Sequence, residues 1–176
     1  MKRWLLSPIV LLSIVGAGAA SIEPAGANAT AKNICPSLSS TTAPPKGVQL
    51  SIDLKTTLVE SGSNFKGYLR ATNKGPKAFM VPDVGQPALM YVVRYGTKQA
   101  VGMFNGGIAG VAAGGNLASG RTFRVRAFGG TTRCDGSFSP LPPGRYQVLA
   151  LFSNGTAGSL PRYLTHPVSL TVTKRS

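Results

Sequence analysis

The side chains of this chain that could do chemistry are mostly arginines and lysines. Lys and Arg together number 19 against five Asp and Glu, and the formal net charge is +14. Arg124 and Arg126 are two residues apart, so an extended strand would place both on one face, and Arg145 follows in the same C-terminal region. Guanidinium groups favour bidentate contacts with carboxylate and phosphate. We therefore identify Arg124, Arg126 and Arg145 as candidate anion-binding residues, while arginines dispersed over a solvated face remain the alternative.

Residues suited to catalysis are few. The one histidine, His166, could act with Asp135 in a Ser-His-Asp arrangement, but a lone His at the start of a strand is more often structural. One His and two Cys, without an acidic loop of the calcium-binding type, leave no metal ligand set. The glycine-rich segment 102–120 lacks a phosphate-binding motif. The sequence thus predicts a protein that is not an enzyme, with no cofactor and no metal.

The N-terminus has the pattern of a secretory signal. Two basic residues precede the uncharged segment 4–22, and Ala27-Asn28-Ala29 supplies the small residues that a signal peptidase reads. We expect residues 1–29 to be a signal peptide cleaved before Thr30, which would export the protein to the periplasm, surface or exterior of a bacterium. An uncleaved membrane anchor is the alternative, because the uncharged segment approaches the roughly 20 residues that span a bilayer.

The two cysteines, Cys35 and Cys134, are predicted to form a disulfide. An exported chain meets an oxidising compartment, where such a pair becomes bonded. The bond would tie the N-terminal region to the turn before Leu141. Two free thiols with a redox role are the alternative, although the pair lacks the Cys-x-x-Cys spacing that lowers a thiol pKa.

The segments that must position these residues are extended. Residues 30–47 are rich in Ala, Ser, Thr and Pro and predict an extended arm. Apolar and polar residues then alternate with a period of two, which is typical of half-buried strands. This pattern is clearest in residues 48–55, 65–72, 121–128 and 167–173.

Two further segments lack a simple alternation. Residues 88–95 combine Leu, Met, Tyr and Val, so we expect them to lie centrally or beneath a loop. Glycine density in residues 100–120 disfavours both helix and regular strand. No sustained helical period occurs after the signal segment. Seven or eight short strands separated by turns predict one all-β domain, an antiparallel β-sandwich over residues 48–176.

The chain is organised around residues 141–152, which read as a turn followed by an apolar strand. The turn contains Leu141, Pro143 and Gly144, and Tyr146 opens the strand. This Leu-x-Pro-Gly-x-Tyr pattern resembles the tyrosine corner of Greek-key sandwiches, where a Tyr near the start of a late strand hydrogen-bonds back to the preceding turn.

Together with the preceding strand Phe123-Arg124-Val125, this turn resembles the C-terminal half of the bacterial intracellular proteinase inhibitor family. The similarity covers roughly residues 121–152. It implies an immunoglobulin-like sandwich and, as an alternative function, a secreted proteinase inhibitor. The export signal, the basic charge, the glycine-rich middle and the expected disulfide depart from that family, and no reactive-site residue can be carried over.

The charge of the processed chain narrows the expected partners. Removing residues 1–29 takes away two basic residues and one acidic residue, which leaves 17 basic, four acidic and a formal charge of +13. The positive electrostatic field around a chain of this charge attracts polyanions. We therefore expect an exported, non-catalytic immunoglobulin-like module at the bacterial envelope, whose cationic surface contacts an envelope protein, an anionic polymer or a lipid surface. Export makes nucleic acid the least expected partner.

Overall fold

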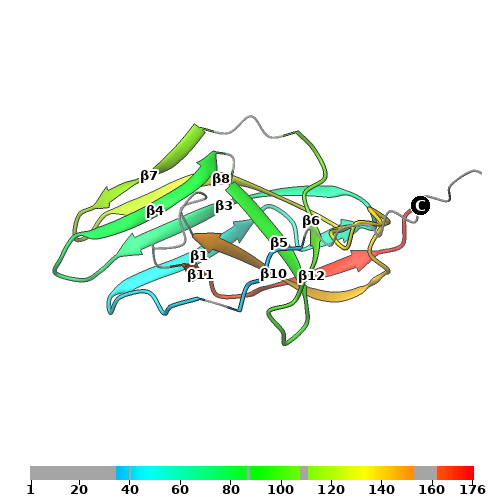
Figure 1. Cartoon of the computed structure of the whole chain (residues 1–176), viewed down its shortest axis with the longest axis horizontal. Coiled ribbons are helices and arrows are strands. Elements are labelled where there is room, and N and C mark those ends of the chain that lie inside the picture. Colours follow the sequence, from blue (N-terminus) through cyan, green and yellow to red (C-terminus); the bar gives the residue numbers. More distant parts are fainter. Residues whose placement is uncertain (1–34, 40, 87, 108–110, 153–161) are drawn as a thin grey trace, which may run out of the picture.

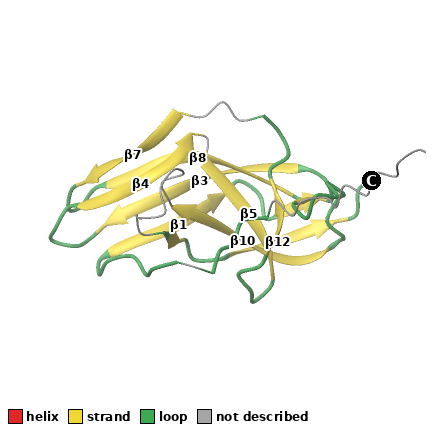
Figure 2. Cartoon of the chain, viewed as in Figure 1, coloured by secondary structure: helices red, strands yellow, loops and turns green. Residues whose placement is uncertain are grey.

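The described residues of the computed structural model are 35–39, 41–86, 88–107, 111–152 and 162–176, and they form strands joined by loops (Figure 2). The predicted signal peptide, residues 1–29, lies outside them. Among the residues described, no helix has the length and apolar character needed to cross a membrane.

Twelve strands make up this part of the chain (Figure 1). In chain order they are β1 (Val48–Leu54), β2 (Leu58–Glu60), β3 (Asn64–Asn73), β4 (Phe79–Gln86), β5 (Ala88–Arg94), β6 (Ala100–Met103), β7 (Val111–Leu117), β8 (Thr122–Gly130), β9 (Thr132–Arg133), β10 (Gly144–Phe152), β11 (Tyr163–Leu164) and β12 (Val168–Thr173).

Ten of the strands belong to one hydrogen-bonded sheet. Its main path runs β1-β3-β8-β5-β10-β12-β2, with β11 beside β10, β6 beside β5, and β9 beside β6. Strands β4 and β7 form a separate two-stranded sheet, and both contact β8 (Figure 1). The β5–β8 and β12–β2 pairs are parallel, whereas the other pairs are antiparallel.

The all-β prediction is confirmed, but the predicted immunoglobulin-like antiparallel sandwich of seven or eight strands is wrong. The sheet is mixed, and β5 joins its two halves by pairing in parallel with β8 and antiparallel with β10. The alternation of apolar residues identifies a strand and its buried face. It does not determine which strands share hydrogen bonds, so the parallel pairs could not be predicted.

The glycine-rich segment 100–120 also differs from its prediction, because it contains β6 and β7. Gly102 shows why glycine suits this strand. A Cβ there would lie 2.7 Å from Cδ1 of Leu141 and 3.1 Å from the carbonyl oxygen of Gly130. The absence of a side chain lets β6 approach its neighbours closely while its backbone remains paired.

The two halves of the large sheet cover one hydrophobic core. Residues 48–54 and 64–73 alternate buried and more exposed positions, as predicted for half-buried strands. The sheet therefore bends so that side chains of β1, β3 and β8 meet those of β10 and β12. Core residues of these five strands include Leu50, Ile52, Phe65, Leu69, Val125, Val148, Phe152, Leu170 and Val172.

A second, smaller core lies where the N-terminal arm covers the sheet. Leu38 of the arm is only 1% exposed and packs in one cluster with Val93 and Leu149. Cys35 and Cys134 are joined by a disulfide with an S–S distance of 2.01 Å, which confirms the predicted bond. The β5 strand is consequently buried on both sides, as its composition led us to expect.

Replacing both cysteines, Cys35→Ser with Cys134→Ser, should destabilise the protein. The bond joins residues 99 positions apart, and losing its constraint on the unfolded chain should lower the free energy of unfolding by up to about 4 to 5 kcal/mol. Urea denaturation followed by circular dichroism measures the change. The wild-type protein in reducing agent should behave like the double variant, and equal unfolding midpoints for oxidised and reduced protein would contradict the prediction.

Candidate functional site

Arg124 and Arg126 lie on the outer face of β8. Both are exposed, whereas Val125 and Ala127 between and after them are buried. The antiparallel register with β3 places Arg70 opposite Arg124. Residues directly opposite each other in a pair share one face of the sheet. We call this surface the β3–β8 face, and it consists of Lys66, Tyr68, Arg70, Arg124, Arg126 and Phe128.

The cations on the β3–β8 face are held by rings and by one carboxylate. The Arg124 guanidinium lies 3.7 Å from the centroid of the Tyr68 ring, which is a close cation–π contact. Arg70 donates a hydrogen bond of 2.6 Å to Asp53 on β1. Both side chains of this ion pair are about two-fifths exposed, so it contributes at most about 1 kcal/mol to stability. Its main effect is to orient Arg70.

Aromatic rings continue along the same face. Lys66 Nζ lies 5.8 Å from the centroid of the Phe128 ring, which in turn contacts the ring of Phe104 at 5.4 Å. Two rings thus lie among the four cations of the paired strands, and Arg70 lies directly opposite Arg124. Within the described part of the chain, these four cations form one ion pair, that of Arg70 with Asp53.

Arg145 lies apart from Arg124 and Arg126. It pairs with Thr171 on β12, and its guanidinium lies 5.2 Å from the centroid of the Tyr95 ring. Strand β5 contacts β8 at Ala88 and Leu89, but Arg145 lies near the opposite end of β5. Six residues of extended strand correspond to roughly 20 Å. The structure therefore separates the predicted arginine set into two groups.

Arg145 instead lines a small hollow with two arginines that sequence analysis did not select, Arg94 and Arg133. The hollow has a volume of about 260 Å³. The register of β5 with β10 places the side chains of Arg94 and Tyr146 on one face of the sheet and that of Arg145 on the other face, over the Tyr95 ring. We call the concavity the arginine hollow, and it is lined by Arg94, Val101, Arg133, Leu141, Pro142, Gly144, Arg145 and Tyr146.

The turn before β10 forms one wall of the arginine hollow. Tyr146 donates a hydrogen bond from its hydroxyl to the carbonyl oxygen of Pro142 at 2.9 Å, which is the contact expected of a tyrosine corner. Leu141 is buried, and its carbonyl oxygen accepts a hydrogen bond from the Ser61 hydroxyl. Pro143 is exposed at the tip, and Gly144 starts the strand. These contacts hold the wall in one position.

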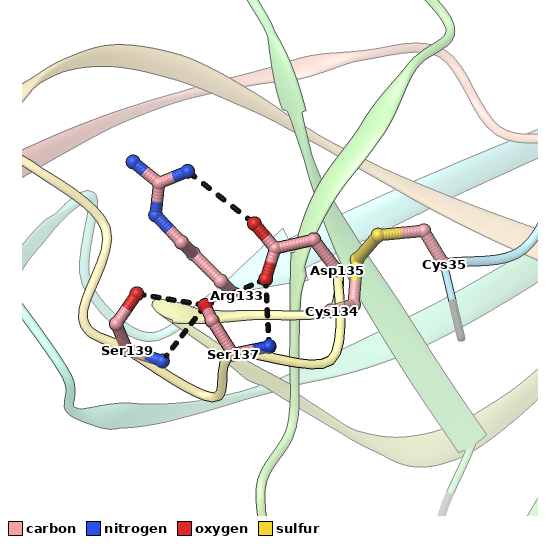
Figure 3. Close-up of polar contacts among 6 residues, drawn as sticks. All are labelled: Cys35, Arg133, Cys134, Asp135, Ser137 and Ser139. Carbon is pink, nitrogen blue, oxygen red and sulfur yellow. Dashed lines mark hydrogen bonds and ion pairs between the residues drawn. A yellow bond between two sulfur atoms is a disulfide. The ribbon is translucent and has the colours of Figure 1, made fainter. Parts of the chain in front are cut away.

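Asp135 belongs to a local turn network beside the disulfide (Figure 3). It accepts hydrogen bonds from the Ser137 hydroxyl at 2.6 Å and the Ser137 backbone N–H at 3.0 Å, and Arg133 contacts it at 3.4 Å. The Ser137 hydrogen bonds, helped by Arg133, hold the pKa of Asp135 below its ordinary value. Asp135 is thus engaged within its own turn rather than with His166, which is exposed before β12. The described residues contain no cluster of three or more metal-ligating side chains.

Comparisons with known proteins leave the chain without an assigned family. The sequence matches no protein-family model and no curated protein. Similar solved structures include a β-glucosidase from Erythrobacter marinus (TM-score 0.43, 13% identity), an alkylpurine DNA glycosylase from Pseudomonas fluorescens bound to DNA containing an abasic site analog (0.42, 11%) and a β-glucosidase from Listeria innocua (0.39, 11%). They cover 72%, 76% and 71% of this chain, which matches only 15%, 31% and 16% of theirs. Likeness at this level assigns neither a fold family nor a function to this chain.

The contact between Arg124 and Tyr68 can be tested without a ligand. Protons held over a ring are shielded, so Tyr68→Leu should move the Arg124 side-chain signals downfield in a proton NMR spectrum and leave those of Arg145 in place. Tyr95→Leu is the matched control, because it should move the Arg145 signals instead. If the chemical shifts of the Arg124 side chain are unchanged in Tyr68→Leu, the contact between Arg124 and Tyr68 is refuted.

Proposed function

We propose that this chain is an exported, non-catalytic binding module of the bacterial envelope, and that its β3–β8 face contacts an anionic polymer. The observation that carries the proposal is the set of four cations on that face, Lys66, Arg70, Arg124 and Arg126, with rings between them. One paired carboxylate accompanies them. Such a surface is complementary to a dense row of negative charges.

The shape of the face favours a chain of repeated anions over a single small ligand. From the Lys66–Phe128 pair to the Arg70–Arg124 pair the face extends roughly 13 Å along the strands. An exposed ion pair contributes at most about 1 kcal/mol, so tight binding at an open sheet surface needs several contacts at once. A flexible polymer with evenly spaced charges supplies them.

The location at the envelope is inferred from the sequence. A basic start, an uncharged segment and small residues before Thr30 support export, and the Cys35–Cys134 bond agrees with an oxidising compartment. Wall polymers and lipid headgroups supply negative charge there. The sequence resemblance alone supports the alternative of a secreted proteinase inhibitor, and inhibition of a panel of proteinases by the purified protein would favour it.

Charge reversal on the face, Arg124→Glu with Arg126→Glu, should weaken binding to polyglycerol phosphate at least about tenfold, because cations that contact phosphate become repulsive anions. Biolayer interferometry at low and physiological salt measures the affinity. Wild-type binding should also weaken as salt rises.

Lys174→Glu with Arg175→Glu is the matched control. It changes the net charge by the same amount at exposed residues beyond β12, outside the β3–β8 face. Equal losses of affinity in both double variants would show that only net charge matters. Unchanged affinity in the Arg124→Glu and Arg126→Glu variant would exclude the β3–β8 face as the binding site. Vesicles containing phosphatidylglycerol distinguish a lipid surface from a polymer, since preferential binding to vesicles would contradict the polymer assignment.

A further inference from the structure

We propose that the N-terminal arm is a redox-controlled strap, which a dithiol releases from the sheet by reducing the Cys35–Cys134 disulfide. We call residues 35–39 and 41–44 the strap. The disulfide pins its far end, and its near end continues through residues 45–47 into β1. Two features of the structure support this role. The strap has few other contacts, and the core beneath it is separate from the main core.

Apart from the disulfide, the strap is held by one buried side chain and a few polar contacts. The buried side chain is that of Leu38, which packs in the second core. Ser37 pairs with Gln99 by a single bridge, and its carbonyl oxygen accepts a hydrogen bond of 3.0 Å from the Arg162 side chain. Thr42 donates its backbone N–H to the carbonyl oxygen of Arg162 at 2.8 Å. Every ordered residue loses backbone entropy, so contacts this few hold the strap only while the bond pins its end.

The core beneath the strap is separate from the main core. In it, Leu38 packs with Val93 of β5, Ala100 of β6 and Leu149 of β10, and Cys134 is buried beside them. Among the described residues, the main core begins in β1 and includes no residue of the strap. Loss of the strap therefore removes one side of the second core and leaves the contacts of the main core in place.

Release of the strap would expose apolar surface of β5 and β10. Val93 and Leu149 are 0% and 4% exposed while the strap covers them. Residues 41–44 of the strap also form one wall of a hollow of about 540 Å³, and Gln147, Leu149 and Leu164 lie among the residues that line the rest of it. Without the strap, this hollow would lose that wall. The disulfide therefore decides whether the apolar surface is covered or exposed to water.

The releasing step is a thiol–disulfide exchange at the bond shown in Figure 3. Cys35 is partly exposed and Cys134 is fully buried, so a thiolate of the dithiol attacks the sulfur of Cys35. The attack forms a mixed disulfide with Cys35 and releases Cys134 as a thiolate, which takes a proton from water. The second thiolate of the dithiol then attacks the mixed disulfide, and Cys35 leaves and is protonated to a thiol. Two electrons pass to the protein, and the dithiol becomes a cyclic disulfide.

NMR relaxation of the processed protein, measured oxidised and in dithiothreitol, tests the strap. On reduction the backbone order parameters of Ser37, Leu38 and Thr42 should fall from about 0.85 to below about 0.6, the range of a flexible segment. The signals of Val148 and Leu170, both in the main core, should keep their positions. Unchanged order parameters would overturn the proposal, because the strap would then stay in place without the bond. Collapse of the Val148 and Leu170 signals to unfolded positions would also overturn it, because reduction would then unfold the whole domain.

Two variants separate the effect of the bond from that of the leucine. Cys35→Ser with Cys134→Ser should have a mobile strap without any reductant and should not respond to dithiothreitol. Leu38→Ala in the oxidised protein should keep the strap ordered, because the bond still pins its end, and a mobile strap in this variant would contradict control by the bond. No residue of the β3–β8 face belongs to the second core, so failure of the strap is distinguishable from failure of that face.

Discussion

The structure depends on the burial of β5 on both of its faces. Met90 and Val92 are fully buried in the main core, and Val93 on the other face is covered by Leu38 of the N-terminal arm. Burial on that second face also raises the pKa of Tyr91, which Arg162 only partly opposes. Because β5 is hydrogen-bonded to β8, β10 and β6, it carries the connection between the two halves of the sheet.

The disulfide serves this arrangement by keeping the arm on the sheet. A short arm that buries one leucine gains little from packing alone, since ordering its backbone costs roughly 1 to 2 kcal/mol per residue. The Cys35–Cys134 bond keeps the arm close to Cys134 even in the unfolded chain, so less entropy is lost when the arm packs on the sheet. Backbone pairing of Ser37 with Gln99 and of Thr42 with Tyr163 then fixes its path.

The two basic regions differ in shape, and their chemistry should differ accordingly. The β3–β8 face lies on two paired strands, and the Phe128 and Tyr68 rings lie beside Lys66 and Arg124. The arginine hollow is concave, and an apolar lining accompanies its cations. The high net charge is therefore distributed between two surfaces with separate geometries.

The sequence by itself determined the strands with clear alternation, the buried position of residues 88–95, the outward direction of Arg124 and Arg126, and the pairing of the only two cysteines. The strands and the outward arginines follow from the local alternation of apolar and polar residues, the buried segment follows from its apolar composition, and the disulfide follows from the presence of two cysteines. The tertiary structure alone decided the parallel pairing of β5 with β8, the two strands in the glycine-rich segment and the position of Arg145. These features depend on hydrogen bonds between distant segments. The backbone N–H and C=O groups that pair strands are the same in every residue except proline. The local pattern of side chains therefore does not show which strands will hydrogen-bond to each other.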